Sequence, residues 1–369
     1  MNKFARDMTG KVVIMPEDRL AVQRILKDCD NFVVTCHNSP DGDALGSCAA
    51  MCHFLTSGGK RCVLVLPDPA PAPLSFVFEP APSFPVYNRE DHPQQVAAAL
   101  AGAGAIVCLD FNHLGRTKLG DAIRACPVPR ILIDHHLNPD RGTFDACISD
   151  VNVSSACELL YYLLLSFDGI NGDASALPPR CAYSLLVGMT TDSNNFANSV
   201  YPTTLRMASE LIAAGVDRED IIDKIYHHYR ENRLRAMGYF LSEKLTLTPQ
   251  KVAYVVFSQE EMLRFGLEEG ETEGFVNLPL SLDAVDMSIF VRELPDRFRV
   301  SVRSKKGVSA NSLAKDYFFG GGHENAAGGM LFKFSSDPKN RLGHPAVVEG
   351  VASAVQYVQD AIVRYFDKQ

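Results

Sequence analysis

Short, continuously apolar runs alternate with helical patterns through the first 200 residues, and this alternation constrains the fold more than any other feature. The expected strands are "NFVVTCH" at 31–37, "RCVLVLP" at 61–67, "AIVCLD" at 105–110 and "RILIDHH" at 130–136. Helical patterns lie between them, as at 44–59 and 94–103. Strands that are apolar along their whole length are typical of parallel sheets buried beneath helices. We therefore predict an α/β domain with a mostly parallel sheet and helices on both faces.

The second part of the chain has a different pattern. Residues 203–240 have the pattern of charged helices, and we predict that they link a domain at 1–202 to a second domain at 241–369. In the second domain, alternating segments such as "RFRVSVRSK" predict half-buried strands, and a final helix is expected near 346–366. The length of 369 residues agrees with two domains, of which the second would be a smaller mixed α+β unit.

Composition limits the partners and the compartment. The net charge of −8 argues against a long duplex-binding surface, but it allows a small phosphate-bearing ligand at a local cationic site. No apolar run approaches the length of a membrane span, and the first residues lack the apolar segment of a signal peptide. The ten cysteines form no CxxC pair and are scattered through apolar stretches. We expect a cytoplasmic protein with reduced thiols and no membrane partner.

Polar residues gather where the predicted strands end. His37 ends the first of these strands, Asp110 ends the third, and Asp134, His135 and His136 end the fourth. Ligands of open parallel sheets bind beyond the carboxyl ends of the strands. We therefore expect these side chains to meet at one edge of the sheet.

The segment "HNSPDGDALGS" places Asp41 and Asp43 one residue apart, where two carboxylates repel each other. A cation would offset that repulsion, and Gly42 leaves room for a tight backbone between them. Asp192, in "GMTTDSNNF", adds a further carboxylate. Mixed carboxylate and imidazole ligands suit two divalent cations, with Mn²⁺ favoured and Mg²⁺ or Co²⁺ as alternatives. An aspartate at a strand end is commonly a helix cap, but the four stretches in order favour a metal site.

These stretches are similar to the motifs of the DHH phosphoesterase superfamily. Asp134-His135-His136 matches the motif that names the family, "HNSPDGDALGS" resembles its first motif, and Asp110 and Asp192 match two others. Further along, "FFGGGHENAAGG" at 318–329 resembles the glycine-rich signature of the DHH-associated C-terminal domain. In length and motif order the chain resembles the nano-RNase and pAp phosphatase group, the short oligoribonucleotide hydrolases.

The resemblance implies a role for each motif residue. In that scheme, His37 and Asp41 bind one metal, Asp43, His135 and Asp192 bind the other, Asp110 bridges both, and His136 contacts the scissile phosphate. The implied reaction hydrolyses nano-RNA, linear dinucleotides such as pApA, or 3'-phosphoadenosine 5'-phosphate (pAp) to mononucleotides. A metal-bridging hydroxide would attack the phosphorus.

The glycine-rich segment has a physical rationale of its own. Gly320, Gly321 and Gly322 permit close backbone approach and can present N–H groups to an anion. His323 and Arg303 would add positive charge for a phosphate of the substrate. A packing turn between strand and helix is the structural alternative, whereas the resemblance implies that the loop binds the nucleotide end distant from the metals.

Other functions stay open at this point. The same site would suit a cyclic dinucleotide phosphodiesterase, or a pyrophosphatase or exopolyphosphatase, although the glycine loop and Arg303 argue against the latter two. A nucleotide-binding sensor with an idle metal site is the non-enzymatic alternative, against which the intact ligand set argues. The sequence does not identify the physiological nucleotide, the direction of attack, the native metal or the oligomeric state, for which a homodimer is one option.

Overall fold

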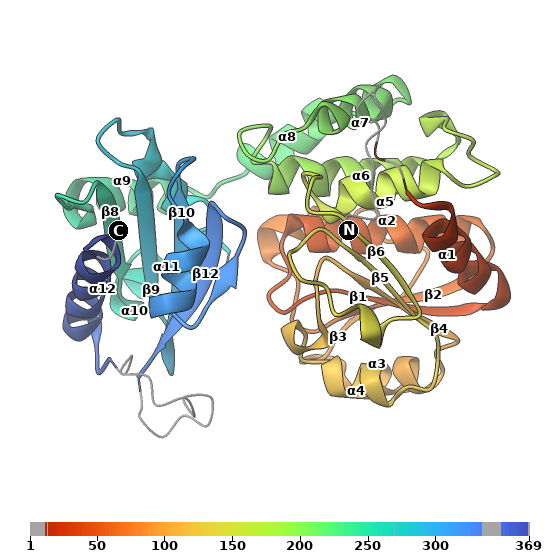
Figure 1. Cartoon of the computed structure of the whole chain (residues 1–369), viewed down its shortest axis with the longest axis horizontal. Helices are drawn as coiled ribbons and strands as arrows, with labels where there is room; N and C mark the ends of the chain where they lie inside the picture. Colours follow the sequence, from red (N-terminus) through yellow and green to blue (C-terminus); the bar gives the residue numbers. More distant parts are fainter. Residues whose placement is uncertain (1–11, 13, 269, 334–347, 368–369) are drawn as a thin grey trace. The chain divides into compact units, whose positions relative to one another are not determined.

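The chain forms two compact units, Met1–His228 and Tyr229–Gln369, each with its own sheet and helices (Figure 1). The computed structural model describes residues 12, 14–268, 270–333 and 348–367. Within that part of the chain, no helix combines the length and the apolar character that crossing a bilayer requires.

The first unit is built on a six-stranded parallel sheet in the order β3-β2-β1-β4-β5-β6. Its strands are β1 (Asn31–Thr35), β2 (Arg61–Leu66), β3 (Val86–Asn88), β4 (Ala105–Leu109), β5 (Arg130–Asp134) and β6 (Ala146–Ser149). From β1 the chain adds β2 and β3 on one side of the sheet, and it then crosses over to add β4, β5 and β6 on the other side. Ligands of open α/β sheets bind at such a switch point, which here lies between β1 and β4. The predicted parallel sheet is confirmed.

Helices cover both faces of this sheet. They are α1 (Pro16–Asp28), α2 (Gly42–Ser57), α3 (Pro93–Ala101), α4 (Gly120–Ala125), α5 (Ala156–Leu165), α6 (Pro179–Asp192), α7 (Pro202–Ala213) and α8 (Arg218–Tyr226), with short 3₁₀ turns η1 (Ala72–Phe78), η2 (Leu114–Arg116), η3 (Arg141–Thr143) and η4 (Ala174–Ala176).

Alternate residues of the central strands pack into two separate apolar cores, one on each face of the sheet. Val34 and Val107 belong to the core beneath α2, α5 and α6, whereas Val33 and Ile106 belong to the core over α3 and α4 (Figure 1). Because side chains alternate across a strand, an uninterrupted apolar run is what a strand between two helical layers requires.

The second unit has a mixed sheet in the order β11-β12-β10-β9-β8-β7, in which only β8 and β9 pair in parallel among the described strands. Its strands are β7 (Thr246–Leu247), β8 (Val252–Phe257), β9 (Met287–Glu293), β10 (Arg297–Ser304), β11 (Gly321–Gly322) and β12 (Ala326–Phe332). Its helices are α9 (Glu231–Tyr239), a π-helical turn η5 (Phe240–Lys244), α10 (Gln259–Arg264), the 3₁₀ turn η6 (Phe275–Ser281), α11 (Ala310–Tyr317) and α12 (Val351–Phe366). The predicted mixed α+β unit is confirmed.

The helices expected at 203–240 divide between the two cores. Met207 and Leu211 of α7 and Ile221 of α8 are buried in the core of the first unit. Ala236 of α9 is buried in the second unit, against β8 and β9. The boundaries 1–202, 203–240 and 241–369 stay a prediction.

Candidate metal centre

The predicted ligands of the first unit meet at the carboxyl edge of its sheet. His37 follows β1, Asp110 follows β4, and His135 follows β5. Asp41 and Asp43 lie at the start of α2, and Asp192 is the last residue of α6. Five elements that are distant in the sequence therefore contribute side chains to one cluster.

The cluster contains two groups of potential ligand atoms. In the first group, His37 Nε2 lies 3.7 Å from Asp41 Oδ2 and 3.3 Å from Asp110 Oδ2. In the second, His135 Nε2 lies 3.8 Å from Asp43 Oδ2 and 3.6 Å from Asp192 Oδ2. Each group could hold one cation.

Asp110 lies between the two groups. Its Oδ2 faces His37, whereas its Oδ1 lies 3.4 Å from His135 Nε2. Oδ1 is buried and has no well-formed hydrogen bond among the described residues. The backbone of Asp110 is left-handed, with φ +62°, a conformation that aspartate tolerates better than most residues and that is often found at functional sites. One carboxylate oxygen toward each group is the arrangement that a bridging ligand requires.

Two backbone contacts orient the aspartates of α2. Asp41 Oδ1 caps the helix, accepting hydrogen bonds from the N–H groups of Asp43 (3.1 Å) and Ala44 (3.0 Å), and leaves Oδ2 toward His37. Asp43 accepts hydrogen bonds from the first N–H groups of α5, Ala156 to Oδ2 (2.6 Å) and Cys157 to Oδ1 (2.9 Å). The positive end of α5 thus stabilises the carboxylate of Asp43.

Glycines let α2 and α6 approach closely enough to place these aspartates near Asp192. A Cβ atom on Gly46 would lie 2.7 Å from Ser184 O, and one on Gly188 would clash with Cys157 Sγ and lie 3.0 Å from Asp43 Oδ1. Gly42 likewise leaves no room for a Cβ atom beside Thr191. The absence of side chains at these glycines therefore allows the contact between α2 and α6 that positions the acidic residues.

The electrostatics of the cluster suit divalent cations. Burial and the neighbouring carboxylates of Asp110 and Asp192 raise the pKa of Asp43 well above its ordinary value. Burial opposes protonation of His135, but hydrogen bonding to Asp110 and the charges of nearby aspartates raise its pKa to about 10. The same balance raises the pKa of His37. Crowded carboxylates, imidazole nitrogens and an unsatisfied Asp110 oxygen form a donor set that fits two divalent metal ions.

His136 is held by Asp134, a residue to which sequence reasoning gave no separate role. His136 Nδ1 lies 2.8 Å from Asp134 Oδ1, and the His136 N–H donates to Asp134 Oδ2 (3.1 Å). Burial and the charge of His135 lower the pKa of His136 despite the hydrogen bond to Asp134. Asp134 therefore fixes the ring orientation, and its place in the motif was the signal that could have shown this role.

The loop that carries His37 is fixed by residues that the sequence did not single out. Asp68 Oδ2 accepts a hydrogen bond from the Ser39 N–H (2.8 Å), and the same carboxylate pairs with Lys118. The Lys118 N–H donates to Asn38 Oδ1 (2.7 Å). No spacing rule connects these positions, because they lie on different loops.

The predicted phosphate-binding loop lies in the second unit, between α11 and β12. Gly320 donates its N–H to Ala314 O (3.1 Å), and a Cβ atom there would clash with Gly328 O, so the close packing of this turn requires a glycine. Gly321 and Gly322 form β11 beside β12. The His323 N–H donates to Ala326 O (2.8 Å).

Arg303 lies beside this loop, because β10 pairs it with Ala326 of β12. Its Nη1 donates to Val302 O (3.0 Å). The structure thus brings Arg303 close to the predicted loop, and their role in binding stays a prediction.

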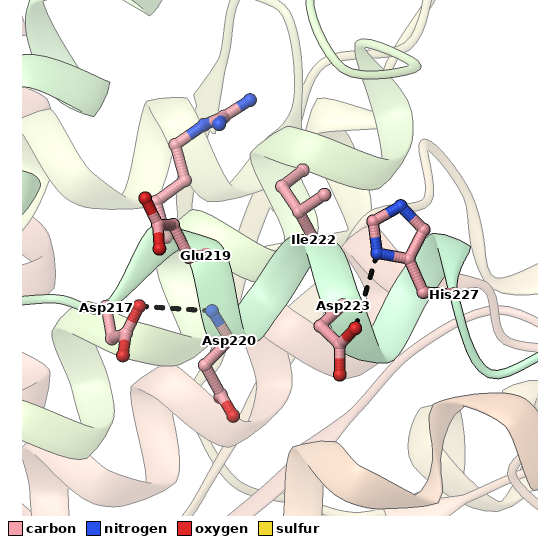
Figure 2. Close-up of a pocket in the computed structure, with 7 residues that line it drawn as sticks. Asp217, Glu219, Asp220, Ile222, Asp223 and His227 are labelled. Carbon is pink, nitrogen blue, oxygen red and sulfur yellow. Dashed lines mark hydrogen bonds and ion pairs between the residues drawn. The ribbon is translucent and has the colours of Figure 1, made fainter.

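A second acidic region of the first unit has an ordinary structural explanation. Figure 2 shows a hollow along α8, lined by Asp217, Arg218, Glu219, Asp220, Ile222, Asp223 and His227. Asp217 caps α8 by accepting from the Asp220 N–H (3.0 Å), and His227 Nδ1 lies 3.3 Å from Asp223 Oδ1 one turn away. These are local helix contacts, and they offer no converging set of ligands.

Comparison with protein families agrees with the geometry of the cluster. The sequence model of the DHH family, N-terminal domain, matches residues 31–189, and that of the DHHA1 domain matches residues 250–353. The chain belongs to the DHH family. The DHH match contains all of the clustered residues except Asp192, and the DHHA1 match contains Arg303 and the glycine loop.

Individual relatives of this DHH protein cover most of its length. Two proteins named bifunctional oligoribonuclease and PAP phosphatase NrnA are 29% identical (Thermus thermophilus, 84% of this chain and 87% of the relative) and 26% identical (Bacillus subtilis, 83% and 90%). A crystal structure of an exopolyphosphatase-related protein from Bacteroides fragilis is 32% identical, covers 96% of this chain and 97% of its own, and superposes with a TM-score of 0.81.

Proposed function

We propose that this DHH protein is a divalent-metal-dependent phosphoesterase that hydrolyses very short nucleotides. The observation that carries the proposal is the position of Asp110, with one carboxylate oxygen toward the His37 group and one toward the His135 group. Relatives named oligoribonuclease and PAP phosphatase support nano-RNA, linear dinucleotides and pAp as the substrate class.

Six residues would bind the two cations. His37 and Asp41 would hold one cation, Asp43, His135 and Asp192 the other, and Asp110 both. Such a pair of cations lowers the pKa of a bound water and stabilises charge on the phosphoryl oxygens. Mn²⁺ is the favoured metal, because imidazole and carboxylate ligands are mixed at the site and no cysteine is among them.

His136 would act on the scissile phosphate from beside the metals. Asp134 orients its ring through Nδ1, so the ring can hydrogen-bond a phosphoryl oxygen without rotating freely. His323, Arg303 and the N–H groups of Gly321 and Gly322 would bind the part of the nucleotide that is not hydrolysed. Because contacts on a second phosphate add affinity, they favour dinucleotides over isolated phosphate esters.

A hydrolysis panel in Mn²⁺ tests the proposal. Its substrates are pAp, pApA, cyclic di-AMP, cyclic di-GMP, RNA of two to five nucleotides, pyrophosphate and polyphosphate. We expect mononucleotides from pApA and short RNA, or phosphate from pAp, and no turnover after chelation. Release of phosphate from polyphosphate or pyrophosphate alone would favour the exopolyphosphatase or pyrophosphatase alternative, and no turnover of any substrate would favour a sensor.

A further inference from the structure

A completely buried carboxylate lies in the first turn of α5, close to the candidate metal centre. It belongs to Glu158, and its Oε1 atom has no hydrogen-bond partner among the described residues. A buried charge lowers the stability of a fold unless close partners compensate for its lost hydration. Glu158 is not one of the proposed metal ligands, so its burial needs another explanation.

The other oxygen of Glu158 holds the beginning of α5. Oε2 accepts hydrogen bonds from the Ser154 N–H (2.8 Å) and from the Ser154 hydroxyl (2.6 Å). The Glu158 N–H donates to the hydroxyl of Ser155 (3.0 Å), the residue that caps the helix. The first two N–H groups of α5 follow directly, and they hold the Asp43 carboxylate. Glu158 therefore fixes the stretch of backbone on which the position of Asp43 depends.

The same oxygen also holds the beginning of α7. Thr204, in the first turn of α7, donates its hydroxyl to Glu158 Oε2 (2.7 Å) and accepts a hydrogen bond from the Tyr201 N–H (3.1 Å). Tyr201 caps α7 and ends the loop that follows Asp192, the last residue of α6. The contact with Glu158 therefore fixes the far end of this loop.

The loop between α6 and α7 depends on being held. Four of its residues have a left-handed backbone, namely Asn194, Asn195, Phe196 and Ser199. Residues other than glycine keep this conformation only where the surrounding structure imposes it. A loop of this kind that begins at Asp192 transmits a change at α7 to the Asp192 carboxylate.

Both held segments lead to the same group of ligands. Asp43 and Asp192 lie 3.8 Å and 3.6 Å from His135 Nε2. The His37 group depends on other contacts, which are the cap of α2 and the loop that Asp68 holds. One buried carboxylate thus supports one group of ligands and leaves the other to separate supports.

We infer that Glu158 is the positioning residue of the His135 group, which holds Asp43 and Asp192 at the separation that a bound cation requires. Its buried charge is retained for the two helix ends that it joins. The inference rests on the proposed function, because it takes the cluster to bind two cations, and it implies that the two sites can be weakened separately.

The test is titration of metal-free, full-length protein with Mn²⁺, in which the EPR signal of the free ion gives the affinity of each site. Glu158→Met, which removes the acceptor oxygens and keeps a similar size, is made in two backgrounds. In His37→Ala, it should weaken Mn²⁺ binding at the remaining His135 group by about tenfold, the lower end of the range for residues that orient metal ligands. In His135→Ala, it should change Mn²⁺ binding at the His37 group by less than about twofold.

Three further variants separate positioning from packing. Glu158→Gln keeps an acceptor oxygen and should retain most of the affinity of the His135 group. Tyr161→Phe breaks another hydrogen bond between α5 and α7, from the Tyr161 hydroxyl to Glu210 Oε2 (2.6 Å), farther along α5. It should lower the melting temperature and leave Mn²⁺ affinity unchanged in both backgrounds. Thr204→Val removes one donor to Glu158 and should weaken the His135 group even if Glu158→Met does not fold.

Each outcome bears on the inference in a defined way. Equal losses of affinity in the two backgrounds, or a loss in Tyr161→Phe as large as that in Glu158→Met, would show that only general packing is involved and would overturn it. Nucleotide hydrolysis by the wild type, with unchanged affinity of the His135 group in Glu158→Met and Thr204→Val, would overturn the inference alone. Selective loss of one Mn²⁺ in a protein that hydrolyses no nucleotide would overturn the proposed function alone. Wild-type protein that binds no Mn²⁺ would overturn both.

Discussion

At the level of single residues, each carboxylate oxygen of Asp110 faces a different histidine. Asp41, Asp43 and Asp192 each contact one histidine of the two, so they can serve only one group of ligands. Asp110 is therefore the residue whose loss should affect both proposed metals.

Asp110→Ala should abolish hydrolysis and lower the occupancy of both metals, because no other residue joins the two groups. His37→Ala should reduce the occupancy of one metal and leave the other in place. Metal content by mass spectrometry and the hydrolysis rate are measured on the same preparations. Two retained metals with near-normal turnover in Asp110→Ala would show that Asp110 does not bridge.

Metal binding should release protons from the histidines. Burial opposes their protonation, but contacts with Asp110 and other carboxylates raise the pKa of His135 to about 10 and that of His37 above its ordinary value. The pKa of about 10 keeps His135 charged near pH 7 without metal, and the pKa values of His37 and Asp43 are raised as well. Ligation requires the deprotonated forms, so metal binding should release at least one proton and strengthen as pH rises. Calorimetry in buffers of different ionisation enthalpy counts the protons. A count of zero would contradict these pKa shifts.

At the level of elements, the contact between α2 and α6 sets the spacing of the acidic residues. Gly46 and Gly188 bring the two backbones together, and Gly188 also lies against Asp43 and Cys157. α5 completes the arrangement, because its first N–H groups hold the Asp43 carboxylate. Three helices are therefore fixed relative to one another at the point where the ligands converge.

Gly188→Ala should lower the free energy of unfolding by about 1–3 kcal/mol and weaken Mn²⁺ binding, because the added methyl group has no space. Gly238→Ala in α9 is a matched control, since a Cβ atom there would meet nothing within 4 Å. That control should be neutral or stabilising by up to about 1 kcal/mol. Thermal denaturation and metal titration test both variants. Unchanged metal affinity in Gly188→Ala would show that the contact between α2 and α6 does not set the geometry of the proposed metal site.

These elements show what the sequence could and could not predict. Uninterrupted apolar runs such as 105–109 identified the buried strands, and the polar residues that follow them identified the edge where the site lies. The hydrogen bonds from α5 to Asp43 join positions more than 110 residues apart, and the Asp68 contact with Ser39 joins separate loops. Local patterns carry no information on such pairings, which depend on how the helices pack.

At the level of the whole molecule, each unit has its own hydrophobic core and its own set of candidate residues. The first unit holds the candidate metal ligands and His136, and the second holds the glycine loop and Arg303. Substitutions in the two units should therefore impair different kinetic constants.

His136→Ala should lower kcat with little change in KM, because in the proposed mechanism His136 acts on charge that grows in the transition state. His323→Ala should mainly raise KM for pApA, corresponding to a loss of about 1–3 kcal/mol for a contact with a charged group. It should leave hydrolysis of bis-p-nitrophenyl phosphate nearly unchanged, because this small ester has no second nucleotide. Equal losses of His323→Ala on both substrates would rule out a role in holding the nucleotide.

The left-handed backbone of Asp110 has a consequence for how this protein can evolve. Glycine adopts a φ of +62° without strain, but replacing the aspartate would also remove the carboxylate that His37 and His135 contact. Selection for thermal stability alone, in the absence of metal, should therefore not enrich Asp110→Gly, because two buried imidazoles would lose their anionic partner. The aspartate is thus favoured by its contacts with two histidines, against the conformational preference of its backbone.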